Sequence, residues 1–275
     1  MTRRQWIMVT RWMALPREEV RSLHQTVILW LGVIAAGFVA GLFDSVVGGG
    51  GVITLPVLLW TGMPPYFALG TNKLAGTFAS STSSFTYFKS QNLYIPLLVW
   101  MIPCTFVGAL IGADTVLGVN QRNLRLVIFI AIVVIAAVTL FKRRLGAENR
   151  FPGLSPQIVA TAMAIAAALG FYDGFVGPGT GTFLLFAFLS VFKFDFLGAA
   201  GNGRVLNFAS NVAALLLFAV RGKIVAAIGL PMGVAMMVGA RVGSRFAIKQ
   251  GVRVIRPLFV VVAVVLSVKM ALSIF

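Results

Sequence analysis

Long apolar segments, separated by short polar connectors, run along almost the whole chain. They lie at residues 26–43, 51–62, 67–88, 93–117, 124–141, 157–176, 181–193, 203–220, 223–245 and 254–274. Most are long enough, at about 1.5 Å per helical residue, to cross a hydrocarbon core of about 30 Å. The segments at 51–62 and 181–193 hold only about a dozen residues, so neither spans a membrane alone as a helix. The pattern predicts an all-α integral membrane protein with eight to ten transmembrane elements, two of them short and interrupted by glycine.

Composition supports this interpretation and excludes a soluble domain of normal size. Of the 275 residues, 59% are hydrophobic and 11% are charged, against about 45–50% and about 25% in soluble proteins. The formal net charge is +16, but Lys and Arg gather in connectors and near segment ends, where they face lipid headgroups and set orientation. We therefore expect the lipid bilayer as a partner and no nucleic acid. Residues 1–25 mix arginine with tryptophan and predict a basic tail on the inner leaflet.

The chain repeats itself in two halves. An offset of 129 residues pairs Asp44 with Asp173, Gly48 with Gly177 and Gly50 with Gly179, and an offset of 131 pairs Lys73 with Arg204 and Ser80 with Asn211. The halves cover residues 26–141 and 157–275, joined by a polar connector at 142–156. If the short segments complete a crossing, each half has an odd number of elements and the halves are inverted, which we expect. If they are re-entrant hairpins, the halves are parallel.

Glycines open both short segments. The first loop reads DSVVGGGG from residue 44 and the second reads GPGTG from residue 177. Non-helical backbone at membrane depth is tolerated where it is buried in protein or lines a cavity, and the first amides of a helix favour an anion. We therefore predict substrate-binding residues at Gly48, Gly49, Gly50, Gly51, Gly177, Gly179, Thr180 and Gly181. The alternative is that the glycines only allow helices to pack closely.

Ionisable side chains at membrane depth add to this prediction. Lys73 and Arg204 occupy corresponding positions of the repeat, and each is followed by polar residues at helical spacing. Two such cations suit a small anion, with hydrogen bonds to its oxygens from Thr71, Asn72, Asn207 and Asn211. Asp44 and Asp173 are the natural partners of the cations, either as residues that couple transport to a proton or as permanent structural salt bridges. Both interpretations of the carboxylates stay open.

Other functional classes receive less support. The single histidine, His24, precedes the first span, so neither a histidine-bearing metal site nor a Ser–His pair forms at depth, and no nucleotide-binding loop follows the glycines. We expect no metal, no cofactor and no catalytic residue. A passive anion channel is the main alternative to a carrier, because cations and helix ends also build pores. An intramembrane acid–base enzyme using an aspartate is a weaker one.

Four stretches carry a family resemblance. DSVVGGGGVITLP and GMPPYFALGTNKLAGTF in the first half, with GFYDGFVGPGTGTF and RVLNFASN in the second, resemble the sulfite exporter TauE/SafE family over residues 26–274. The resemblance implies an inner-membrane carrier of two related halves that moves sulfite, organosulfonates or other sulfur-containing anions. It places the family's glycine loops at residues 48–51 and 177–181. One departure is Gly203–Arg204, where similar members commonly show Thr-Lys, so the cation is kept with a different geometry.

Together these observations predict a secondary transporter of small sulfur-containing anions in the bacterial inner membrane. The site lies between the glycine loops, and coupling is to protons or to the membrane potential.

Overall fold

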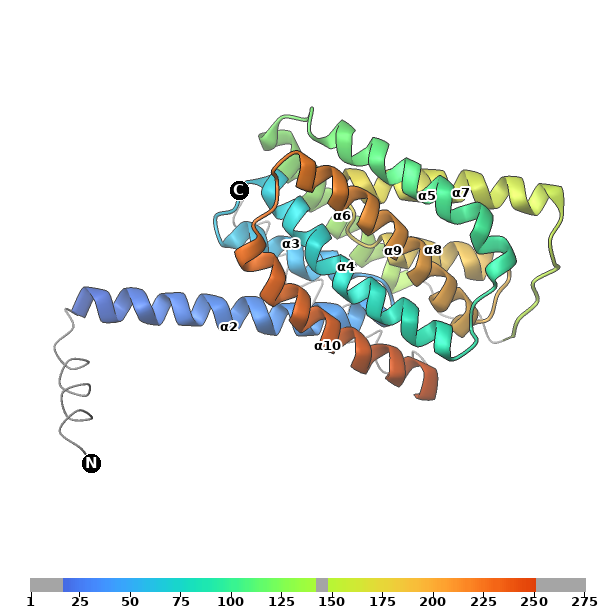
Figure 1. Cartoon of the computed structure of the whole chain (residues 1–275), viewed down its shortest axis with the longest axis horizontal. Helices are drawn as coiled ribbons and strands as arrows, with labels where there is room; N and C mark the ends of the chain where they lie inside the picture. Colours follow the sequence, from blue (N-terminus) through green and yellow to red (C-terminus); the bar gives the residue numbers. More distant parts are fainter. Residues whose placement is uncertain (1–16, 142–147, 251–275) are drawn as a thin grey trace.

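Helices make up all the regular secondary structure of the residues described by the computed structural model, which are 17–141 and 148–250. In chain order they are α2 (Arg17–Val46), α3 (Gly50–Trp60), α4 (Pro65–Lys89), α5 (Ile95–Val116), α6 (Gln121–Phe141), α7 (Pro156–Phe175), α8 (Thr180–Ser190), α9 (Phe196–Val220) and α10 (Ala226–Gln250) (Figure 1). The all-helical class predicted from the sequence is confirmed for these residues. The predicted segment at 254–274, most of the basic tail and part of the connector lie outside them.

Five of the helices are long and apolar enough to cross a membrane: α2 from Ile28, α5, α7, α9 and α10. Helix α4 has 25 residues, yet it does not join them because its TNK and STSS stretches make it polar. The two short helices α3 and α8 have 11 residues each. Two starts differ from the sequence prediction, since α2 begins at Arg17 and α9 at Phe196.

Local sequence explains where several helices begin. Proline occupies one of the first two positions of α4, α5 and α7, where its missing N–H costs nothing. The side chain of Ser155 accepts a hydrogen bond from Ile158 N at the start of α7, and Asp195 accepts one from Gly198 N at the start of α9. Such caps satisfy amides that have no partner within the helix.

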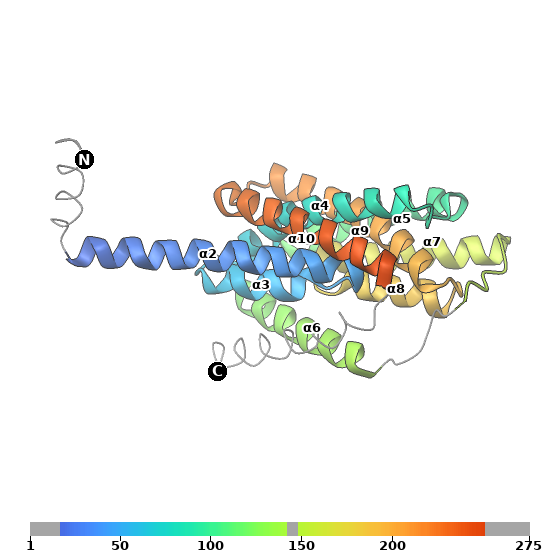
Figure 2. The ribbon, with the colours of Figure 1, turned by 90° about the horizontal axis from the view of Figure 1, so that it is seen from below.

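The chain turns back on itself before each short helix. Residues 47–49 connect α2 to α3, which packs along α2 in the reverse direction, and residues 176–179 connect α7 to α8 (Figure 2). Both connections carry glycine at a positive φ, at Gly48 and at Gly177 and Gly179. The two short helices therefore both begin near the middle of the molecule.

The outer helices pair across the chain. Helix α10 packs along α2 and α5 packs along α7 more extensively than any other two pairs. A Cβ at Gly41 would lie 2.1 Å from the carbonyl oxygen of Met236, and one at Gly170 would lie 2.3 Å from that of Thr105. Backbones this close require glycine, as is common where membrane helices cross.

Helices α4 and α9 cross at the centre and run antiparallel. Near one end of their contact, a Cβ at Gly70 would lie 3.1 Å from Phe218 Cβ, and near the other end one at Gly201 would lie 3.3 Å from Tyr87 Cβ. Between these points Asn211 Nδ2 lies 3.4 Å from Ser80 Oγ. One apolar cluster lies mainly among α2, α3, α4, α6 and α10, and a second mainly among α5, α7, α8 and α9. The polar residues of the two central helices lie between them.

Candidate functional site

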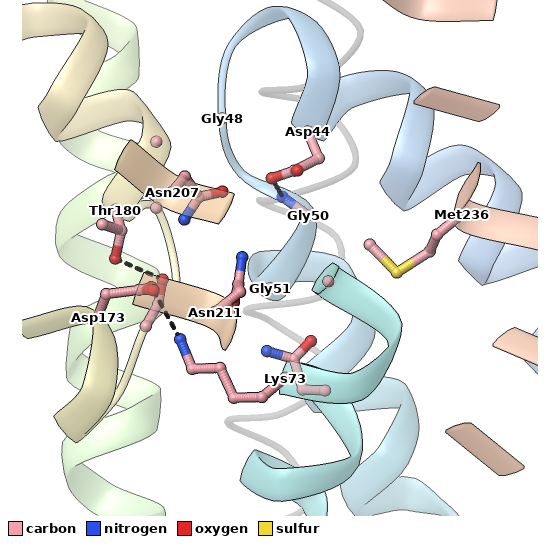
Figure 3. A pocket seen from close by; sticks show the side chains of 15 residues that line it. Asp44, Gly48, Gly50, Gly51, Lys73, Asp173, Thr180, Asn207, Asn211 and Met236 are labelled. Atoms are coloured by element: carbon pink, nitrogen blue, oxygen red, sulfur yellow. Dashed lines mark hydrogen bonds and ion pairs between the residues drawn. The ribbon is translucent and has the colours of Figure 1, made fainter. Parts of the chain in front are cut away.

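A polar cavity lies where the two glycine loops meet (Figure 3). Helices α2, α3, α4, α7, α8, α9 and α10 or the loops beside them contribute to it, and no described residue of α5 or α6 does. The lining residues are Asp44, Gly48, Gly50, Gly51, Asn72, Lys73, Gly76, Asp173, Gly177, Gly179, Thr180, Gly181, Asn207, Asn211 and Met236. Most of the residues proposed from the sequence are thus brought together at one place.

Lys73 and Asp173 form a buried ion pair across the cavity. Lys73 Nζ on α4 lies 2.9 Å from Asp173 Oδ2 on α7, and each side chain is only 2% exposed (Figure 3). The amine also lies against the second glycine loop, because a Cβ at Gly177 would stand 3.0 Å from it. Charges buried this deeply need a partner, and each of these two supplies it for the other.

Arg204 forms the second buried pair and lies between the two glycine loops. Its Nη1 lies 3.3 Å from Asp44 Oδ2, and the residue is 1% exposed. A Cβ at Gly48 would stand 2.3 Å from Nη2, and one at Gly181 would stand 1.8 Å from it. These two glycines therefore make room for the guanidinium. Arg204 does not line the cavity, unlike Lys73.

Asp44 has a second role at the start of α3. Its Oδ1 accepts a hydrogen bond from Gly50 N at 3.1 Å, so the first amide of α3 is already bound to a carboxylate of the protein. The positive end of a helix favours such a negative group. The sequence interpretation treats this helix end as open to a bound anion, whereas in the structure Asp44 occupies part of it.

Thr182 joins the second half of the chain to the first loop. Its amide donates to the carbonyl of Gly48 at 2.9 Å. Its hydroxyl lies 3.0 Å from the carbonyl oxygens of Gly48 and of Val47. The start of α8 and the loop before α3 are thus held together at the cavity wall.

Some of the remaining residues bond to neighbours at the cavity, and others lie away from it. Thr54 donates to Asn72 Oδ1, Asn207 Oδ1 lies 3.5 Å from Arg204 Nη1, and Thr180 Oγ1 donates to Gly177 O at 2.9 Å. Besides Arg204, two predicted site residues do not line the cavity. Thr71 Oγ1 accepts a hydrogen bond from Val225 N at 3.0 Å, and Gly49 is the N-cap of α3.

The charges of the site balance. Two cations and two carboxylates meet there as two pairs, and within residues 17–141 and 148–250 no group of three His, Cys, Asp or Glu side chains is placed to hold a metal ion. An anion entering the cavity meets donors such as Lys73 and Asn211, but to bind Lys73 fully it must displace Asp173. The pairs fit both interpretations of the carboxylates, as coupling residues and as structural salt bridges.

Comparison with known proteins identifies the family. The family model for the sulfite exporter TauE/SafE matches residues 33–270. The chain belongs to the TauE/SafE family. It is a multi-pass membrane transporter, and a transporter of this kind has a small-molecule substrate. No solved structure gives a significant match.

Bacterial relatives of the TauE/SafE chain are similar over nearly their whole length. The probable membrane transporter protein YfcA of Escherichia coli is 36% identical over 257 residues, which are 92% of this chain and 94% of YfcA. The probable membrane transporter protein ORF9 of Sinorhizobium sp. is 34% identical over 238 residues, 86% of this chain and 90% of ORF9. A probable membrane transporter protein of Haemophilus influenzae is 33% identical over 238 residues.

Sequence reasoning missed two lining residues of this TauE/SafE transporter. Gly76 lies one turn after Lys73 on α4, and a Cβ at this glycine would lie 3.3 Å from Asn211 Oδ1. Its helical spacing from Lys73 indicates that it lies on the same face of α4. Met236 lies within a long apolar run on α10 and has no such signal. It reaches the cavity because α10 packs closely on Gly41.

Proposed function

We propose that this protein is a secondary transporter of small sulfur-containing anions, such as sulfite or organosulfonates, in the bacterial inner membrane. The observation that carries the proposal is the Lys73–Asp173 pair, buried between two glycine loops in a cavity with asparagine amides on its walls. An incoming oxyanion replaces Asp173 as the partner of Lys73. The family's description as sulfite exporters supports the choice of sulfur-containing anions.

Several donors around Lys73 suit an oxyanion. The amides of Asn207 and Asn211 and the start of α8 at Gly181 line the same cavity. Of the first amides of α8, that of Thr180 donates to Gly177 O and that of Thr182 to Gly48 O, and we assign the Gly181 amide, which lies between them, to the substrate. Charge-assisted hydrogen bonds to oxyanions are the stronger ones in proteins.

The proposal includes two inverted halves that alternate access around this cavity. The antiparallel crossing of α4 and α9 supports inversion, since these helices carry the corresponding residues Lys73 and Arg204. The close contacts of the outer helices also correspond, because the two offsets of the repeat carry Gly41 to Gly170 and Thr105 to Met236. In this interpretation, counting the short helices α3 and α8 and the segment predicted at 254–274 brings the number of elements in each half to five, which is odd.

The balance of two cations and two carboxylates in the site suggests how anion transport is coupled to a proton. In the empty site each cation faces a carboxylate, so a monovalent anion binds without adding net charge only if one carboxylate takes up a proton. We assign this role to Asp173, the partner of the lysine that lines the cavity. A proton then travels with the anion, and collapse of the pH gradient across a vesicle should slow its accumulation. Unchanged flux would exclude proton coupling and favour the membrane potential.

The first test is binding to the purified protein. Sulfite, sulfate, thiosulfate, sulfoacetate and taurine are added separately, and thermal stability is measured, since a ligand bound to the folded state raises it by mass action. We expect one anion to stabilise the wild type and to have no effect on a folded Lys73→Ala variant. Arg221→Ala is the matched control, because its pair with Asp114 is exposed. If no anion stabilises the wild type, or the lysine variant responds equally, this site is wrong.

Transport in proteoliposomes separates a carrier from a passive channel. A carrier gives saturable flux and accelerated exchange when the same anion is present on both sides. Flux that rises linearly with concentration and shows no exchange would favour the channel.

A further inference from the structure

Arg204 has a buried donor that the structure leaves without a partner. Its Nε makes no hydrogen bond in the described part of the protein, although the residue is 1% exposed. A buried donor without a partner costs roughly 1–3 kcal/mol, and more when it is charged. The polar contacts of the guanidinium, to Asp44 and towards Asn207, both use Nη1, whereas Nη2 lies between Gly48 and Gly181.

Ser84 also has an unpartnered buried polar atom, and the register of α4 against α9 places it level with Arg204. Its Oγ is buried and has no partner among residues 17–141 and 148–250, whereas Thr77, Ser83 and Thr86 on the same helix each donate to a carbonyl one turn back. Tyr87 lies opposite Gly201 where α4 and α9 cross. Because the two helices run antiparallel, Ser84, one turn before Tyr87, lies level with Arg204, one turn after Gly201.

Thr105 on α5 provides a third unpartnered hydroxyl. The residue is 1% exposed, and its Oγ1 has no partner in the part of the chain that the structure describes. Its carbonyl lies against Gly170 as the carbonyl of Met236 lies against Gly41. Met236 and Lys73 line the cavity, whereas their counterparts Thr105 and Arg204 do not. The repeat therefore places Thr105 near Arg204, as Met236 and Lys73 lie at one cavity, and Arg204 itself contacts Gly48, Gly181 and Asn207, which line that cavity.

We propose that Arg204, Ser84 and Thr105 form a second anion-binding station, which is closed in this structure and opens towards the opposite face of the membrane. This inference rests on the proposed function. When access switches, the anion leaves Lys73 and binds the Nε edge of Arg204, with the hydroxyls of Ser84 and Thr105 as further donors. A guanidinium presents two parallel donors and suits the planar edge of an oxyanion, whereas an ammonium acts as a point charge.

Side-specific labelling tests the position of the station. The native Cys104 is replaced by alanine, and single cysteines are introduced as Met236→Cys, Thr105→Cys and Ser84→Cys. A membrane-impermeant thiol reagent is then applied to right-side-out and to inverted vesicles. We expect Met236→Cys to react from one face and the other two from the opposite face, with the transported anion changing their rates in opposite directions. Reaction of all three from the same face, or no reaction of the second two under any condition, would overturn the proposal.

Removal of the hydroxyls gives a second measurement that does not depend on cysteine. Ser84→Ala and Thr105→Val remove groups that have no partner in this state, so thermal stability should not fall. The apparent affinity for the anion should fall about 5–10-fold at the face opposite Met236, which corresponds to one lost hydrogen bond, and stay unchanged at the other face. Ser83→Ala, which removes a hydroxyl bonded within its own helix, should change neither affinity.

Wild-type exchange in the same vesicles separates the two possible failures. If wild-type flux is saturable and shows exchange but the hydroxyl variants keep wild-type affinity at both faces, only the second station is wrong. If the wild type shows no exchange, the carrier itself is wrong.

Discussion

Arg204 Nη1 lies 3.3 Å from Asp44 Oδ2, and the same guanidinium fills the space between Gly48 and Gly181. One arginine therefore contacts the glycine loops of both halves as well as the acid that begins the first loop. The glycines of DSVVGGGG are needed for two different reasons. Gly48 gives space to the arginine and adopts a left-handed backbone, whereas Gly50 and Gly51 open a helix at the cavity wall.

Gly48→Ala should destabilise the protein much more than Gly62→Ala. Both glycines have nearly the same φ, +85° and +83°, but a Cβ at Gly62 meets nothing within 4 Å. Gly62→Ala therefore measures the cost of the left-handed backbone alone, about 1 kcal/mol. Gly48→Ala adds collisions with Arg204 and Gly181, about 1–3 kcal/mol more. Unfolding in detergent measures both, and equal losses would contradict the position of the arginine.

Single substitutions of the Lys73–Asp173 pair should be more harmful than the double substitution. Lys73→Met or Asp173→Asn leaves one buried charge unpaired, at about 3–5 kcal/mol, whereas the double variant leaves none. The exposed pair Arg221–Asp114, with side chains 55% and 59% exposed, is the control and should change stability by less than about 1 kcal/mol.

Transport by the same double variant distinguishes the two roles of the pair. We expect it to fold but not to transport, since it has lost the two groups to which we assign anion binding and proton coupling. A stable double variant that transports at the wild-type rate would show that the pair is a structural salt bridge only.

The sequence predicts the two short helices well, because each is a short apolar segment that begins at glycines. The sequence predicts short segments at 51–62 and 181–193, and the helices begin at Gly50 and Thr180. The start of α9 was missed because Asn202 and Arg204 interrupt its apolar pattern, although the Asp195 cap starts the helix at Phe196. Packing against α4 and α8 overrides the local polarity there.

Asp44→Asn should be less destabilising than Asp44→Ala. Both variants remove the charge beside Arg204, but asparagine keeps an oxygen that accepts the Gly50 amide at the start of α3. The difference in unfolding free energy should be about 1 kcal/mol, as for other N-terminal caps. Identical values for the two variants would mean that the hydrogen bond contributes nothing.

Thr182→Val should loosen the contact between the glycine loops, and Thr182→Ser should preserve it. Valine keeps the shape but loses the hydroxyl that lies 3.0 Å from two carbonyl oxygens of the first loop, at a cost of about 1 kcal/mol. Hydrogen exchange of peptides covering residues 44–52 should be faster in the valine variant only. Equal exchange in all three proteins would exclude a role for the hydroxyl in holding the loop.

The sequence predicts most residues of the candidate site, but it does not predict which cation forms an ion pair with which carboxylate. The repeat named two cations and two carboxylates, but which joins which depends on how the halves pack, and each cation pairs with the aspartate of the other half. The same packing decides that Thr71 bonds to Val225 instead of facing the cavity. It also brings Met236 to the wall from a stretch that reads as ordinary apolar helix.

The pairing of α2 with α10 also affects how the protein is made. Met236, which contacts Gly41, is synthesised about 200 residues after it, roughly 10–40 s later at ordinary rates of translation. Throughout that time the glycine-lined face of α2 has no helix to pack against, and the loop before α3 lacks both Arg204 and Thr182. The first half is therefore synthesised before Arg204, Thr182 and α10, which contact its glycine loop and the glycines of α2 in the folded protein.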